Sequence, residues 1–145
     1  MYKQFVVSTI LILFVITCNN LYTDTIIYGN WEGSYNAHKV SFVFKNDNTC
    51  IYKYYDKQLS KFEIINGDYN VDFSKNPIPL SIRNINQLNH SLYTIVEFIG
   101  GDSIRIAGFS PKWKLRPISF EIAKTISLKR IQWGFHHDNE IRIKY

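Results

Sequence analysis

The feature that most constrains the fold of this 145-residue chain is the alternation of apolar and polar residues from Tyr28 onward. In the stretch 29–35, Trp31, Gly33 and Tyr35 share one face and the residues between them share the other. The same two-residue period recurs in short segments separated by Gly, Pro, Asn and Asp, and no segment shows a helical period. The pattern predicts an all-β protein.

About eight to ten short strands are expected, in hairpin-like order. After 29–35 they are expected within 39–45, 49–56, 61–65, 66–73, 80–85, 92–99, 102–109, 118–123 and 125–131. Asn66-Gly67 predicts a turn or bulge, and Pro77 and Pro79 predict a loop or sheet edge. Closing such a meander removes its exposed edges. We therefore predict an up-and-down antiparallel β-barrel of about eight strands over 28–131, whose interior is filled by side chains or holds one small ligand.

Composition is typical of one soluble domain with an ordinary core, since the chain is 46% hydrophobic and 16% aromatic. The formal net charge is +5, with Lys+Arg 17. These positive residues are scattered along the chain. A nucleic-acid-binding protein gathers them on one face, so no nucleic-acid partner is expected.

The N-terminal segment predicts export. One positive charge, Lys3, precedes a run from Phe5 to Cys18 without charged residues. This run is shorter than the ~20 residues of a spanning helix, and is typical of a signal peptide, here 1–17 with its signal helix. Its end, VITCNN, resembles the bacterial lipobox, which implies lipidation of Cys18, although Thr17 stands where Gly, Ala or Ser is usual. A plain cleaved signal and an uncleaved anchor are the alternatives.

Lipidation would make the protein a membrane-anchored lipoprotein of the cell envelope, with 18–27 as a polar tether. It would also leave Cys50 as the one remaining cysteine. Cys50 lies in a predicted strand and is expected to pack as a small apolar side chain. A Cys18–Cys50 disulfide is the rival interpretation.

The GNW at 29–31 resembles the Gly-x-Trp signature on the first strand of lipocalins and related small barrels (calycins). The resemblance implies that Trp31 packs across the closed end of the barrel, under an arginine from the last strand. Arg130 shares the parity of Ile126 and Leu128, which places it on the apolar face of its strand. A guanidinium there needs a partner, and an indole ring is a suitable one. If a bulge shifts the alternation of inward and outward residues by one, Arg130 faces water instead.

Further residues resemble a small bacterial lipocalin-like family of unknown function, over about 29–130. Its pattern includes an Asp followed by Lys and Pro, a Tyr-rich strand, Gly-Asp before an apolar strand, RP-x-x-F, and a closing L-x-R. The matching residues are Asp72, Lys75, Pro77, Tyr93, Gly101, Asp102, Ile104, Ile106, Arg116, Pro117, Phe120, Leu128 and Arg130. The resemblance implies a fold and no activity. Residues 132–145 lie outside it, as a tail or an extra strand.

The sequence carries no recognisable catalytic or metal-binding motif. His136 and His137 are adjacent, so in a strand they would point to opposite faces and chelate one ion poorly. There is no nucleophile elbow and no phosphate-binding glycine loop. We expect no enzyme, no metal and no cofactor.

The basic stretch 112–116 (KWKLR) has three possible roles. It would contact anionic lipid headgroups, rim the barrel mouth around an anionic ligand, or form a solvated loop whose Trp113 folds back over the core.

The expected function is non-catalytic binding of a small apolar or amphipathic molecule at the open end, opposite Trp31. Inward-facing aromatic residues would line the site: Phe42, Tyr52, Tyr69 and Tyr93. The alternative is a solid barrel whose surface contacts an envelope protein. An enzyme is a third possibility. The oligomeric state does not follow from the sequence.

Overall fold

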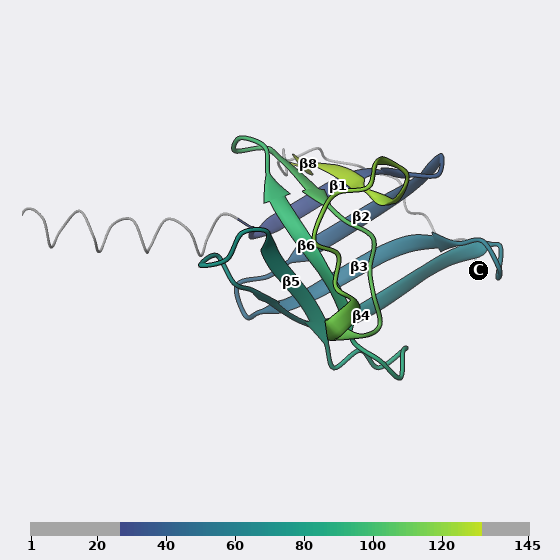
Figure 1. Ribbon diagram of the computed structural model, residues 1–145. Coiled ribbons are helices and arrows are strands. Elements are labelled where there is room, and N and C mark those ends of the chain that lie inside the picture. The colour runs from purple at the N-terminus through teal and green to yellow at the C-terminus, as the bar shows by residue number, and fades with distance from the viewer. Residues whose placement is uncertain (1–26, 132–145) are drawn as a thin grey trace, which may run out of the picture.

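The computed structural model describes residues 27–131, which form one antiparallel sheet closed into a barrel (Figure 1). Each strand pairs with the next along the chain, and the last pairs with the first. The predicted all-β, up-and-down barrel of eight strands is therefore confirmed. The strands are β1 (Gly29–Tyr35), β2 (His38–Phe44), β3 (Thr49–Asp56), β4 (Lys61–Val71), β5 (Ile78–Arg83), β6 (Leu92–Phe98), β7 (Ser103–Ile106) and β8 (Ile126–Ile131).

Tight turns join the first strands of the barrel and set their register. Between β1 and β2, Tyr35 pairs with His38, so the turn contains only Asn36 and Ala37. Both have positive φ, 51° and 65°, which gives the strands of a two-residue hairpin their right-handed twist. Asn tolerates this backbone readily, and it recurs at Asn48 in the β2–β3 turn (φ 64°).

The predicted break at Asn66-Gly67 is wrong, because β4 runs through it as one strand of 11 residues. Gly67 pairs with Cys50 in an unbroken register with β3. A Cβ atom at Gly67 would lie 2.6 Å from the carbonyl oxygen of Arg83. The glycine therefore allows the backbone at the end of β5 to approach β4, where a turn was expected.

The predicted strand at 118–123 is also wrong. β7 pairs directly with β8, so the barrel has no position for a strand between them. The segment 107–125, here called the outer segment, instead carries two short 3₁₀ helices, η1 (Trp113–Leu115) and η2 (Ile122–Lys124). Figure 1 shows it crossing in front of β6, and Tyr93 of β6 forms a β-bridge with its Ser110.

The core fills the barrel interior. Alternate residues of each strand face inward, as in β2, where Val40, Phe42 and Phe44 are buried. β5 differs, since four consecutive residues, 79–82, are buried. Leu80 and Ile82 belong to the interior core, and the outer segment covers part of the opposite face.

Several predictions concern other parts of the chain. The signal peptide 1–17, Cys18, the tether as far as residue 26, and the tail 132–145 with His136 and His137 lie outside the described residues. Within residues 27–131, no helix is long and apolar enough to cross a membrane.

Candidate functional site

One end of the barrel is organised around Trp31; we call it the Trp31 end. Odd-numbered strands begin there and even-numbered strands finish there. Trp31 is fully buried and pairs with Arg130 across the β1–β8 ladder. The guanidinium carbon of Arg130 lies 4.2 Å from the centroid of the Trp31 ring, an arrangement that strand parity and the lipocalin resemblance both predict.

Backbone carbonyls hold the guanidinium over the indole ring. Arg130 donates hydrogen bonds to the carbonyl oxygens of Tyr28 and Gly101. Gly29 has a φ of 124°, and a Cβ atom on it would lie 2.7 Å from an Arg130 nitrogen. The backbone conformation therefore favours glycine at position 29, and the missing side chain leaves the Arg130 guanidinium its place.

Trp31 also fixes the chain that leads into β1. Its indole nitrogen donates a 2.8 Å hydrogen bond to the carbonyl oxygen of Ile27, and the Ile27 side chain is buried. A buried indole N–H needs such an acceptor. The residues just before β1 are thereby held against the Trp31 end.

Three of the four predicted ligand-binding aromatics face the interior, where they contact one another or neighbouring rings. Phe42 stacks on Tyr52 with ring centroids 4.1 Å apart, and Phe109 lies 5.5 Å from Tyr52. Tyr69 meets Phe44 edge to face at 5.0 Å. These rings occupy the space in which a ligand was expected and contribute to the core.

Tyr93 does not face the interior, so its predicted place there is wrong. Its neighbours Leu92 and Thr94 pair with the inward-facing Ile82 and Leu80, whereas Tyr93 pairs with Ser81 on the outer face. The Arg116 side chain of the outer segment reaches this face. Its guanidinium carbon lies 5.5 Å from the Tyr93 ring centroid, and it donates a 2.8 Å hydrogen bond to the Ser81 hydroxyl.

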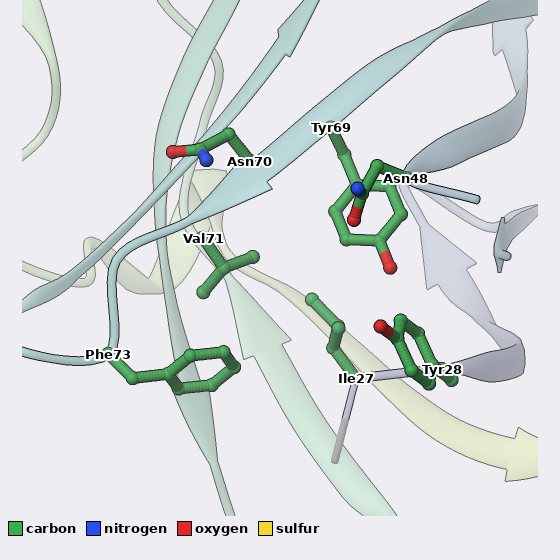
Figure 2. Close-up of a pocket in the computed structure, with 7 residues that line it drawn as sticks. All are labelled: Ile27, Tyr28, Asn48, Tyr69, Asn70, Val71 and Phe73. Carbon is green, nitrogen blue, oxygen red and sulfur yellow. The ribbon is translucent and has the colours of Figure 1, made fainter. Parts of the chain in front are cut away.

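A cavity of about 400 Å³ lies at the Trp31 end, between the residues that lead into β1, the β2–β3 turn and the final part of β4. We call it the end cavity. Figure 2 shows apolar side chains along one side and two tyrosine rings along the other, with their hydroxyl groups toward each other. Its lining residues are Ile27, Tyr28, Asn48, Tyr69, Asn70, Val71 and Phe73.

One of these phenols is buried and hydrogen-bonded. Tyr69 is buried, and its hydroxyl donates a 2.9 Å hydrogen bond to the carbonyl oxygen of Lys45. Burial raises the pKa of Tyr69 well above its usual range, and the neighbouring Tyr28 hydroxyl adds to the effect. Near neutral pH Tyr69 is therefore protonated, with an oxygen lone pair available as an acceptor.

Two further cavities, of about 420 and 220 Å³, also lie outside the barrel interior. The first is lined by residues 84–86 and 88–91, all from the β5–β6 connection, and the second by residues of the outer segment. Each is thus formed by a single loop. The end cavity differs because it joins three segments distant in sequence and includes the buried side chains of Ile27 and Tyr69.

The basic stretch 112–116 lies along the outside of β5 and β6. Arg116 contacts Ser81 and Tyr93 there. Trp113 keeps 65% of its surface exposed, so it does not fold back over the core. Among the interpretations of this stretch, the self-covered loop is therefore wrong.

Reactive side chains are dispersed. Cys50 is a free cysteine buried in the core, and burial raises the pKa of its thiol to about 12, so it is unreactive at neutral pH. His38 stacks on Tyr55 with ring centroids 3.8 Å apart, and His90 lies in the β5–β6 connection. Between residues 27 and 131, no three His, Cys, Asp or Glu side chains come together as a metal site.

Comparison of the chain with protein-family models, curated proteins and solved structures finds no match. The resemblance to a lipocalin-like family therefore stays a prediction.

Sequence analysis found Tyr69 but missed the other residues of the end cavity. The alternation of Tyr69, Val71 and Phe73 placed these three on one face and so contained part of the signal. Tyr28, Ile27 and Asn48 come from two distant segments. The β3–β4 pairing places Asn48 beside Tyr69, whose backbone N–H donates to the Asn48 carbonyl oxygen, whereas Ile27 and Tyr28 reach β4 across the end of the barrel.

Proposed function

We propose that this protein is a non-catalytic binding module that holds a small amphipathic molecule in the end cavity. The observation that carries the proposal is the cavity itself. Its volume of about 400 Å³ lies within the usual range for small-molecule sites, and it draws on three separate segments. The site therefore differs in position from the expected one, which was the end of the barrel opposite Trp31.

The lining defines the chemistry of the ligand. The half-buried Val71 and Phe73 offer an apolar surface, and the buried Ile27 lies beneath it. The phenols of Tyr28 and Tyr69 and the amide of Asn48 offer donors and acceptors without formal charge. A molecule with a short apolar part and a neutral polar group fits this mixture.

The barrel interior is a poorer candidate. Phe42 and Tyr52 are stacked and at most 7% exposed, so a ligand between them would have to separate two packed rings. Separation would lose the contact that stabilises the core.

Filling the cavity tests this proposal. Native mass spectrometry of the protein purified from its own cells should show an additional small mass, which Val71→Trp should abolish because the indole occupies the cavity. Ile64→Trp is the matched control, since Ile64 is an exposed residue of the same strand. The proposal would be contradicted if the wild-type protein carried no additional mass, or if Val71→Trp retained it.

We also propose that the barrel is exported and tethered to a cell-envelope membrane through Cys18. The apolar run from Phe5 to Cys18 and the lipobox-like VITCNN support this. Radioactive palmitate should label the wild-type chain and fail to label Cys18→Ser. Persistent labelling of that variant would contradict the anchor and leave the end-cavity proposal unaffected.

A further inference from the structure

The outer segment presents large apolar side chains to solvent. Trp113 and Leu115 are each 65% exposed, Ile118 84% and Ile122 97%. Together they project from one ten-residue stretch that begins with η1 and ends at the first residue of η2. Single exposed apolar residues are common, but such a group marks an interaction surface.

Other residues of the same segment hold it against the barrel. Ser110 and Tyr93 exchange two backbone hydrogen bonds of 2.9 Å. Arg116 bonds Ser81, and the Arg105 guanidinium carbon lies 4.5 Å from the Phe120 ring centroid. The exposed apolar residues are thus displayed on an attached segment, while separate residues provide its contacts with β5, β6 and β7.

Positive charge surrounds these apolar side chains. Within 107–125 there are four basic residues, Lys112, Lys114, Arg116 and Lys124, and one acidic residue, Glu121. Lys112 and Lys114 flank Trp113, and the Lys114 ammonium lies 5.7 Å from its ring centroid. At the other end of the stretch, Glu121 pairs with Lys124. The end that contains Trp113 is therefore more positive than the end that contains Ile122.

We propose that the outer segment is a docking surface for an anionic lipid bilayer. Trp113, Leu115, Ile118 and Ile122 enter the headgroup region, while Lys112 and Lys114 contact anionic headgroups. Tryptophan is favoured at the membrane–water boundary, and basic residues near an anionic surface add to the binding.

The shape of the surface favours a bilayer over a protein partner. Trp113, Ile118 and Ile122 protrude into solvent and do not line the cavity of about 220 Å³ in the outer segment, whose lining includes only Leu115 of the four. Protruding aliphatic side chains with basic residues beside them suit the interface of an anionic bilayer, which can deform around them. This proposal is independent of the end cavity, which other residues form at the Trp31 end.

Fluorescence quenching by brominated lipid tests the docking. The full chain carrying Trp133→Phe is reconstituted into vesicles of brominated phosphatidylcholine, with or without phosphatidylglycerol. Trp31 is fully buried, so Trp113 is the tryptophan that lipid can reach. We expect strong quenching of Trp113 in the vesicles that contain phosphatidylglycerol, and weaker quenching in phosphatidylcholine alone.

Removal of two charges completes the test. Lys112→Gln with Lys114→Gln should weaken the contact about 30-fold and reduce the quenching to the level in phosphatidylcholine. The matched control is Lys45→Gln with Lys57→Gln, on the β2–β3 and β3–β4 turns, which should quench like the wild type. Two results would overturn the proposal. One is no quenching of Trp113 by vesicles that contain phosphatidylglycerol, which is what a protein-binding surface would give. The other is an equal loss of quenching in both double variants.

Discussion

The barrel interior and the outer segment contain similar apolar residues in opposite environments. Trp31, Phe42, Ile104 and Leu128 are at most 1% exposed, whereas Trp113 and Ile122 are 65% and 97% exposed. Packing explains the first group, since each side chain contacts others in the core. It does not explain the second group, for which binding to another surface supplies a reason. The stability of the fold therefore depends on the first group, and the proposed membrane docking depends on the second.

Among substitutions that test this comparison, Trp31→Ala should cause the largest loss of stability. Loss of a fully buried indole should lower the free energy of unfolding by ~3–5 kcal/mol, measured by urea denaturation. The control, Trp113→Ala, removes an exposed indole and should cost only about 0.5 kcal/mol. Similar losses in the two variants would mean that the interior and the outer segment do not differ as described.

Arg130→Gln comes next, because it removes the cation that covers Trp31. The carbonyl oxygens of Tyr28 and Gly101 lose a donor, and the expected cost is ~1–3 kcal/mol in the same denaturation experiment. Lys39→Gln is the matched control, since Lys39 forms a partly exposed pair with Glu32 on the outer face. A surface pair contributes ~0–1 kcal/mol, so a larger loss for Lys39 than for Arg130 would reverse the comparison.

Cys50 supplies a smaller, pH-dependent effect. Burial raises the pKa of its thiol from 9.0 to about 12, so the unfolded chain releases this proton at a lower pH than the folded chain. The contribution of Cys50 to stability is therefore fully present below pH 9.0 and decreases as pH rises from 9.0 toward 12. Cys50→Ala should give a flatter dependence of unfolding free energy on pH over that interval. An unchanged dependence would contradict the burial of the thiol.

The sequence predicted those features that depend on local alternation. The period of two along β1 and β8 placed Trp31 and Arg130 inward, and the turn residues separated the strands of an eight-stranded barrel. The stretch 118–123 also alternates, but it has no strand to pair with because β7 and β8 are already neighbours. Alternation alone therefore predicts a strand without establishing that the sheet has room for it.

Nonlocal contacts account for the remaining errors. Tyr93 has the aromatic character of a core residue, yet it lies under the outer segment, so its burial depends on residues about 20 positions later. The end cavity likewise depends on closure of the barrel, which joins Ile27 and Tyr28 to β4. Neither arrangement follows from a periodic pattern within one segment.

The most direct test of the separation between the two groups is the stability of a variant with three outer substitutions. Trp113→Ser, Ile118→Ser and Ile122→Ser together should lower the free energy of unfolding by no more than about 1.5 kcal/mol, because each side chain is largely exposed. Phe42→Ala, in the interior, should alone cost ~3–5 kcal/mol in the same urea denaturation. A triple variant as unstable as Phe42→Ala would show that the outer segment belongs to the core, and would contradict this account.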